Sequence, residues 1–280
     1  MKLILQGPQA TEAHAREIAD IAGANSLQAL GPHAFRCDGI SDSSALRSTV
    51  AVACSEAHID SAFVPADFSL SDFRLLVMDM DSTLITIECI DEIADMQGLK
   101  SEVSAITEAA MRGELDFRAS LSQRVALLKG LDASALHQVF EQRLQLSAGA
   151  RELLQGMRQA GLRTVLVSGG FTYFTDRLQQ ELKLDVTRAN LLEVQDGKLT
   201  GKVIGEIIDA EAKQKTVESE SAALGVPPSA AIVIGDGAND LQMMSVAGLS
   251  IAFRAKPVVQ AKASVALNYS GLDAVLNLFR

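Results

Sequence analysis

The sequence contains no tryptophan, few histidines and few cysteines, and these scarcities exclude several classes of protein. Its three cysteines, Cys37, Cys54 and Cys89, are scattered, with no CxxC pair and no cluster with histidine. A disulfide scaffold and a zinc site both need such spacing, so both are excluded. Each cysteine is expected to be a small buried hydrophobe in a reducing compartment.

Long apolar runs are also absent. No run reaches the roughly 20 residues that a membrane-spanning helix needs. The N-terminus has no basic stretch followed by an apolar core, which a secretory signal would show. We therefore expect a cytoplasmic protein without membrane contact.

Positive charge is scarce, with 25 Lys and Arg against 35 Asp and Glu and a formal net charge of −10. This balance disfavours nonspecific binding to nucleic acid, whose phosphates attract basic surfaces. An acidic protein that handles an anionic substrate must therefore concentrate positive charge locally. The 48% content of hydrophobic residues predicts a real core, and 280 residues suit one large domain or two smaller ones.

The N-terminal part shows the pattern of a small α+β module. Strands and helices are expected at 1–8, 11–24, 26–39 (two strands around a Gly-Pro turn), 43–59 and 60–65. The order β-α-β-β-α-β is that of a ferredoxin-like unit, and it resembles an amino-acid-sensing ACT-type module in pattern. Pro65 and the polar residues after it indicate a boundary, so the module is expected over residues 1–71.

Residues 72–280 are predicted to form a doubly wound α/β domain with a parallel sheet. Apolar strands without alternation are expected within 74–81, 161–170, 229–237, 249–253 and 264–268. A hairpin is expected at 191–205 around Asp196-Gly197, and the stretch 86–148 reads as helical with no strand. Ligands of such a sheet bind beyond the carboxyl ends of its strands.

Asp79 and Asp81 lie at the carboxyl end of the first of these strands. In extended backbone, residues i and i+2 project to the same side, so both carboxylates can address one ligand. One carboxylate can attack phosphorus, and a second can transfer protons if repulsion keeps it protonated. The competing interpretation is two solvated acids in a loop, which would show the same sequence pattern.

Asp236 and Asp240 follow another apolar strand, in the segment IVIGDGAND. If the two strand tips are neighbours, they offer several oxygen ligands and no nitrogen or sulfur, a set that suits Mg²⁺. The competing interpretation is an ordinary turn, because Gly, Asn and Asp all favour turns. Two acidic strand ends in one sheet favour the metal site.

Ser168-Gly169-Gly170 follows a third strand and offers a hydroxyl and backbone N–H groups to an anion. By itself this is also a common strand-to-helix turn. Lys213 is a candidate phosphate ligand, but Lys215 lies beside it and both are compatible with a solvated helix face.

The ordered set D-M-D-S-T, V-S-G-G-F, a lysine and G-D-G-A-N-D resembles the haloacid dehalogenase superfamily. Within it, residues 73–280 resemble the phosphoserine phosphatases, also in the segments DMDSTLITIECIDEIA and GELDFRASLSQRVALLKGL. The resemblance implies that Asp79 is the nucleophile and Asp81 the general acid and base. It further implies Mg²⁺ held by Asp79, the backbone carbonyl of Asp81, and Asp236, with Asp240 behind them.

The resemblance also implies a substrate site. Phosphate would be bound by Ser168, Gly169, Lys213 and Asn239, and Lys213 is preferred to Lys215 because its distance from Asp236 fits the family pattern. The helical stretch becomes a cap inserted at about 87–148. From this cap Glu88 would bind the substrate's amino group and Arg124 its carboxylate, while Met111 and Phe117 would line the pocket. Without the resemblance these four would be read as solvated helix positions or core.

The expected function is therefore Mg²⁺-dependent hydrolysis of O-phosphoserine through an aspartyl-phosphate, the last step of serine biosynthesis. Two alternatives remain open: the same chemistry on phosphohomoserine or phosphothreonine or with transfer to another acceptor, and a non-catalytic amino-acid sensor. A small phosphoamino acid is the expected partner. A homodimer and an amino-acid effector at the N-terminal module are also left open.

Overall fold

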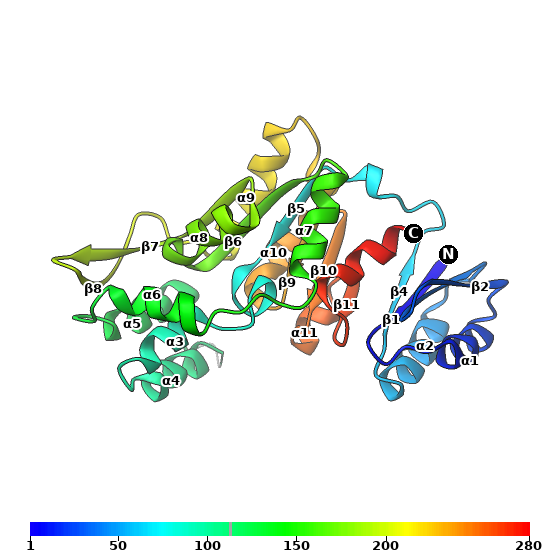
Figure 1. The fold of residues 1–280 in the computed structure, drawn as a ribbon, viewed down its shortest axis with the longest axis horizontal. Helices are drawn as coiled ribbons and strands as arrows, with labels where there is room; N and C mark the ends of the chain where they lie inside the picture. The colour runs from blue at the N-terminus through cyan, green and yellow to red at the C-terminus, as the bar shows by residue number, and fades with distance from the viewer. Residues whose placement is uncertain (112–113) are drawn as a thin grey trace.

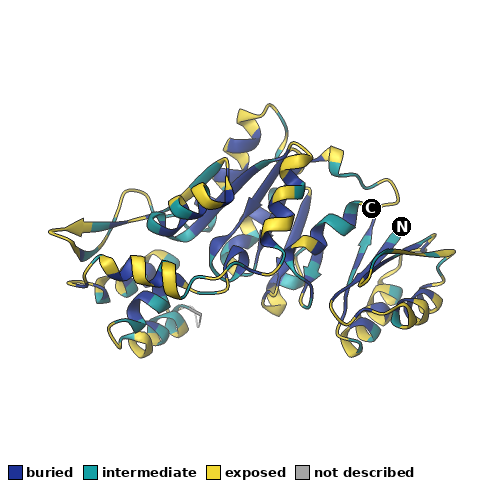
Figure 2. Cartoon of the chain, in the orientation of Figure 1, coloured by how far each residue is buried: buried dark blue, intermediate teal, exposed yellow. Residues whose placement is uncertain are grey.

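The computed structural model describes the backbone of residues 1–111 and 114–280, with all of their side chains except that of Met111. Figure 1 shows a central α/β body, a small N-terminal module near the C-terminus, and a group of helices at the far end, which we call the cap. The central strands of the body are buried, whereas the outward faces of the helices and much of the projecting β7–β8 hairpin are exposed (Figure 2).

The N-terminal module is an antiparallel sheet of order β2-β3-β1-β4 with two helices on one face. Its elements are β1 (Lys2–Gln6), α1 (Glu12–Ala22), β2 (Ser26–Gly31), β3 (Ala34–Asp38), α2 (Ser44–Glu56) and β4 (Asp60–Val64). The side chains of Thr11 and Ser43 cap the two helices. The β-α-β-β-α-β order expected from the sequence is confirmed.

The other face of this small sheet packs on the α/β body. Ile4 and Val64 belong to the same apolar cluster as the core of the body. The buried carboxylate of Asp60 accepts hydrogen bonds of 2.7 to 3.3 Å from the backbone N–H groups of residues 268–270. Apolar and polar contacts together therefore hold the module against the C-terminal part of the body.

The body contains a sheet of order β11-β10-β9-β5-β6-β7-β8. These strands are β5 (Leu75–Met78), β6 (Arg163–Phe171), β7 (Val186–Gln195), β8 (Lys198–Ile204), β9 (Ala231–Gly235), β10 (Leu249–Phe253) and β11 (Val265–Leu267). Within this sheet, every pairing among the described strands is parallel except that of β7 with β8. Asp196 and Gly197 have φ of 50° and 76° at the β7–β8 turn, which confirms the expected hairpin.

Helices cover both faces of this sheet, so the predicted doubly wound α/β fold is confirmed. They are α7 (Ala150–Gln159), α8 (Thr172–Leu182), α9 (Ala210–Ala223), α10 (Leu241–Val246) and α11 (Pro257–Gln260). Leu76 and Met78 face the core that includes α7 and α8, whereas Leu75 and Val77 face the core that includes α9 and α10. This double burial explains why the strands show apolar runs without alternation.

Along the chain, the cap is inserted between β5 and α7, and its described part consists of helices. These are α3 (Cys89–Asp95), α4 (Lys100–Met111), α5 (Phe117–Leu127) and α6 (Ser134–Gln142). The chain enters and leaves the cap side by side, because Ile85 pairs with Leu146 and the Thr86 N–H donates to the Gln145 carbonyl at 2.9 Å. No helix in the described residues combines the length and apolarity needed to cross a membrane.

Candidate active site

The three strands that carry the candidate residues are neighbours in the sheet. β5 lies between β6 and β9, so Asp79 and Asp236, which follow β5 and β9, and Ser168, near the end of β6, lie at one edge. The backbone is extended at Asp79 (ψ 160°) and Asp81 (ψ 137°), and the intervening Met80 is fully buried. The sequence pattern is thus realised as three polar strand ends at one place.

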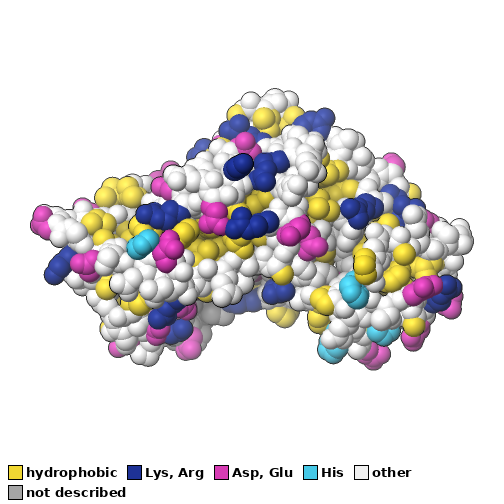
Figure 3. All heavy atoms as spheres, in the orientation of Figure 1, with side chains coloured by type: hydrophobic (Ala, Val, Ile, Leu, Met, Phe, Trp, Pro, Cys, Tyr) yellow, Lys and Arg dark blue, Asp and Glu magenta, His cyan; other side chains and the backbone are white. Residues whose placement is uncertain are grey.

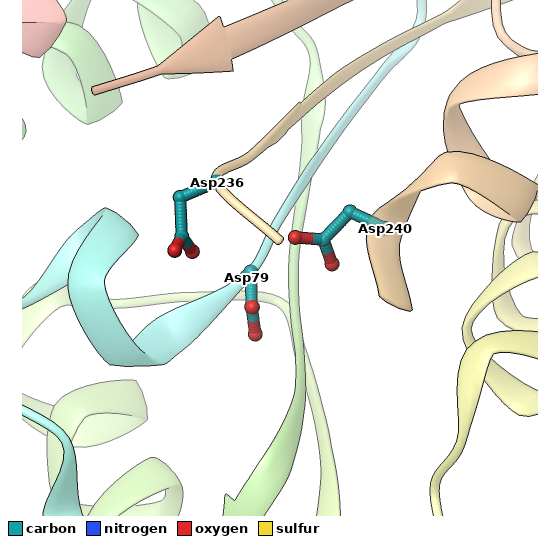
Figure 4. A group of neighbouring side chains, drawn as sticks. All are labelled: Asp79, Asp236 and Asp240. Carbon is teal, nitrogen blue, oxygen red and sulfur yellow. The ribbon is translucent and has the colours of Figure 1, made fainter. Parts of the chain in front are cut away.

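Asp79, Asp236 and Asp240 form an acidic cluster in the described structure (Figure 4). Each offers one carboxylate oxygen, and these oxygens lie within 4.8 Å of one another. Asp79 and Asp240 are buried, and Asp236 is partly buried. Burial and the nearby Asp240 raise the pKa of Asp236 to about 6, and the same two causes raise the pKa of Asp79 well above its usual value.

Lys213 brings positive charge into this cluster. Its ammonium nitrogen lies 2.8 Å from Asp79 Oδ1 and 2.7 Å from Asp240 Oδ1, and its side chain is fully buried. Burial alone would lower the pKa of Lys213, but Asp240 and Asp79 outweigh burial and raise this pKa. Lys215, by contrast, is exposed and pairs with Glu211 on the outer face of α9. Within the site, positive charge is therefore supplied by a buried lysine. On the surface visible in Figure 3, acidic and basic side chains are interspersed.

The free oxygens of this cluster fit a divalent cation. Asp240 uses one oxygen for Lys213 and the other for the Gly237 N–H at 3.0 Å. Asp79 Oδ1 accepts from Lys213 and from the Met80 N–H at 2.7 Å. Three ionised carboxylates beside one ammonium leave an excess of two negative charges, which a divalent cation would balance. A set made only of oxygens suits a hard cation.

Asp81 lies in a different environment from Asp79. Its Oδ1 accepts from the Cys89 N–H at 2.9 Å, and its Oδ2 accepts from the Ser168 hydroxyl at 3.4 Å. Burial raises the pKa of Asp81, against the lowering effect of the hydrogen bonds from Cys89. Its two oxygens thus contact the start of α3 and the Ser168 hydroxyl near the end of β6, and burial shifts its equilibrium toward the protonated form.

The Ser168-Gly169-Gly170 segment differs from the simple turn expected after the strand. β6 continues through Phe171, and its pairing with β7 shifts register between Val167 and Phe171. This irregularity releases the segment from the regular ladder. A Cβ on Gly170 would lie 2.6 Å from Asp81 Oδ2, so only glycine permits this approach of the backbone to Asp81.

Two candidate residues of the cap lie at its boundary with the body. Phe117 contacts Gly169, where a Cβ would meet the ring at 2.8 Å. Glu88 precedes α3 and accepts from the Ser82 hydroxyl at 2.6 Å. Although Glu88 reaches solvent, the surrounding protein and the nearby Asp81 raise its pKa to about 8.

The remaining candidates are less fully engaged in this structure. Arg124 on α5 is partly buried and donates to the Ser120 carbonyl at 3.4 Å. Burial lowers the pKa of Arg124 despite the opposing charge of Asp91. Asn239 lies in the turn between Asp236 and Asp240 and is partly exposed. Met111 ends α4, but its side chain lies outside the described residues.

Sequence reasoning missed three polar residues that support this site. Thr83 donates to Asp236 Oδ1 at 3.1 Å, Ser82 donates to Glu88, and the buried Asn190 donates to the Gly169 carbonyl at 2.7 Å. Thr83 and Ser82 were visible in the D-M-D-S-T motif, although nothing in it showed their partners. Asn190 had a weaker signal, a single amide inside the apolar strand segment A-N-L-L.

The chain matches known proteins over this same region. The family model described as haloacid dehalogenase-like hydrolase matches residues 76–245. A phosphoserine phosphatase of Polaromonas sp. strain JS666 is 54% identical over 219 residues, which cover 76% of this chain and 93% of the relative.

Solved structures agree with this match. An unliganded probable phosphoserine phosphatase from Vibrio cholerae superimposes with a TM-score of 0.85 at 36% identity, covering 99% of this chain and 86% of that one. A phosphoserine phosphatase solved as a phospho-aspartyl intermediate analogue has a TM-score of 0.70 at 38% identity, covering 74% of this chain and 99% of that one. The chain therefore belongs to the haloacid dehalogenase-like hydrolases, and within them to the phosphoserine phosphatase family.

Proposed function

We propose that this protein is a Mg²⁺-dependent phosphatase that hydrolyses O-phosphoserine to serine and phosphate through an aspartyl-phosphate on Asp79. The observation that carries this proposal is the contact of Asp79 with the buried Lys213. Asp81, two residues further on, is bound by a different group, the Cys89 N–H. One carboxylate is held next to a cation, and the other is held by the Cys89 N–H and the Ser168 hydroxyl. Phosphoryl transfer through a carboxylate needs this division.

Two chemical steps follow from the arrangement. An oxygen of Asp79 attacks phosphorus, the bond from phosphorus to the serine oxygen breaks, and Asp81 gives its proton to that oxygen. Asp81 then takes a proton from water, which attacks phosphorus and breaks its bond to Asp79, releasing phosphate. The similar phosphatase solved as a phospho-aspartyl intermediate analogue supports this route.

Asp79, the backbone carbonyl of Asp81, and Asp236 would hold Mg²⁺. When bound, the ion would neutralise phosphoryl charge and the crowding of the carboxylates. Asp240 has both oxygens engaged by Lys213 and Gly237, so its proposed role is to fix Lys213. Thr83 orients Asp236 by donating to its Oδ1.

Charge stabilisation must supply much of the rate. Enzymes can accelerate hydrolysis of phosphate monoesters by up to ~10²¹, which requires lowering the barrier by more than ~20 kcal/mol. Proton transfer by Asp81 offers about 3–5 kcal/mol, and positioning about 7–11 kcal/mol. The remainder is assigned to local positive charge and N–H donors. Ser168, Gly169, Lys213 and Asn239 are the proposed phosphate ligands.

Substrate choice is assigned to the cap. Glu88 would bind the ammonium group and Arg124 the carboxylate of phosphoserine, with Phe117 and Met111 covering the site. Arg124 is suited to this because no carboxylate among the described residues lies within ion-pair distance of it. We place the cap at about 87–148 within residues 72–280, and the N-terminal module at 1–71.

A phosphate-release assay tests the proposal. Phosphoserine, phosphothreonine and phosphohomoserine are supplied with Mg²⁺ and, separately, with excess chelator. We expect the highest kcat/KM for phosphoserine, loss of turnover with chelator, and no turnover by a folded Asp79→Asn variant. Substantial Mg²⁺-dependent activity of Asp79→Asn would refute the nucleophile, and preference for another of the three substrates would refute phosphoserine as the substrate.

A further inference from the structure

Asn190 is a fully buried amide whose two polar atoms both bind backbone groups. Its Nδ2 donates to the Gly169 carbonyl at 2.7 Å, and its Oδ1 accepts from the Ile208 N–H at 2.9 Å. It stands on β7 opposite Phe171, where pairing with β6 resumes after the register shift. A buried amide with both ends satisfied fixes the two backbone segments that it joins.

Both segments lead to the candidate phosphate ligands. Gly169 is next to Ser168, whose hydroxyl contacts Gly170 N–H and Asp81. Ile208 is next to Asp209, the N-cap of α9, and Lys213 lies one turn into that helix. The Asn190 amide therefore joins the irregular end of β6 to the segment that precedes the helix carrying the buried lysine.

The cap contacts the body at these same two segments. Phe117 lies against Gly169, and the adjacent Arg118 donates to Asp209 Oδ2 with its Nε at 2.7 Å. Asp209 Oδ1 also accepts from the Ala212 N–H at 3.0 Å, so one carboxylate caps α9 and binds the cap. The surface on which the cap closes is thus made of two segments that Asn190 holds together.

We propose that Asn190 is a positioning residue that sets the spacing between the Ser168–Gly169 segment and the Lys213 helix, and with it the surface that receives the cap. The inference rests on the proposed function, because it assigns these segments to binding of the phosphoryl group. Displacement of one segment would separate Lys213 from the N–H donors across the phosphate. A displacement of about 1 Å can reduce a rate by about 10²-fold.

Two variants separate the parts of the bridge. Asn190→Ala removes both hydrogen bonds. Asn190→Asp keeps the shape and the acceptor for Ile208 but places an oxygen against the Gly169 carbonyl, where a donor is needed. A matched control is Thr164→Val on β6, which removes an equally buried polar group that contacts Asp185, away from both segments.

The full-length variants are compared by thermal unfolding, by kcat and KM for phosphoserine with Mg²⁺, and by inhibition with inorganic phosphate. We expect Thr164→Val to lose stability while it keeps kcat and phosphate inhibition within about threefold. Both Asn190 variants should lose about 10²-fold in kcat and bind phosphate at least about tenfold more weakly. An effect on binding and rate beyond that of the control identifies positioning.

Three outcomes would overturn the proposal. Asn190 variants that lose stability alone, with kcat and phosphate inhibition like the control, would show a structural role. If neither Asn190 variant folds, Asn190 is needed for folding, which is also a structural role and not a positioning one. Wild-type protein without activity on phosphoserine would instead refute the proposed function, and the inference with it.

Discussion

The ammonium group of Lys213 lies 2.8 Å from Asp79 Oδ1, inside the protein and out of contact with solvent. Three carboxylates crowd around this one cation, so the site remains short of positive charge. That shortage favours binding of a divalent cation, which would in turn offset the negative charge of a phosphoryl group. The same contact also has a consequence for stability.

Lys213→Met should destabilise the metal-free protein strongly. The change keeps the apolar stem but leaves the buried carboxylates of Asp79 and Asp240 without their cation, and breaking a buried ion pair costs about 3–5 kcal/mol. Urea unfolding in the presence of chelator measures the loss. Lys215→Met, which breaks only the exposed pair with Glu211, should leave the free energy of unfolding nearly unchanged. Equal effects of the two changes would contradict the buried pair.

Glu88→Gln should make the protein more stable at high pH. The pKa of Glu88 is raised from 4.5 to about 8 in the folded state, mainly by burial. Between these pH values the unfolded chain releases the proton and the folded protein keeps it, so stability present below pH 4.5 is lost as pH rises through 8. Glutamine cannot ionise and removes this dependence.

Thermal unfolding with chelator at pH 5 and pH 8.5 tests this sign. The two proteins should unfold at similar temperatures at the lower pH, and the variant at a higher temperature at the upper pH. At pH 8.5, where Glu88 of the wild-type protein is ionised, the same variant should bind phosphoserine more weakly, because it lacks the charge that would pair with an ammonium group. A wild-type protein that is the more stable one at pH 8.5 would refute the raised pKa.

The sequence was sufficient for the fold of the body and for the meeting of Asp79 with Asp236. Apolar strands and the rules of parallel sheets place their carboxyl ends together whatever the loops do. Sequence spacing could not show which of Lys213 and Lys215 belongs to the site. The two differ in burial, because Lys213 lies on the buried face of α9 and Lys215 on the exposed face. Asn190 and Asp60 escaped notice because their partners lie on distant segments, and only tertiary packing shows them.

Arg118→Ala should weaken closure of the cap without unfolding the protein. The guanidinium of Arg118 makes hydrogen bonds and an ion pair with Asp209, but more than half of its side chain is exposed. Such an exposed pair contributes little, so KM for phosphoserine should rise only about two- to fivefold. Arg16→Ala, which breaks the exposed pair with Glu12 in the N-terminal module, is the matched control. Steady-state kinetics that are identical for both variants would exclude a contribution of Arg118 to closure.

Asp60→Ala should loosen the N-terminal module from the body. The Asp60 carboxylate satisfies the backbone N–H groups of residues 268–270, and nothing in an alanine replaces it. The Ser270 N–H is the buried donor among them, and a buried donor left without a partner costs about 1–3 kcal/mol, so a loss of at least this size is expected. Asp60→Asn, which retains one acceptor oxygen, should lose less.

Hydrogen exchange of individual amides distinguishes local from global unfolding in Asp60→Ala. Amides of β4 and of residues 268–270 should exchange faster, while those of β5 and β9, which carry Asp79 and Asp236, should keep their protection. Turnover of phosphoserine should then stay near the wild-type value, because β4 of the module contacts β11 at the edge of the large sheet, whereas Asp79 and Asp236 follow the more central strands β5 and β9. Unchanged exchange at residues 268–270 would show that the apolar contacts of Ile4 and Val64 suffice to hold the module, and the carboxylate would lose its assigned role.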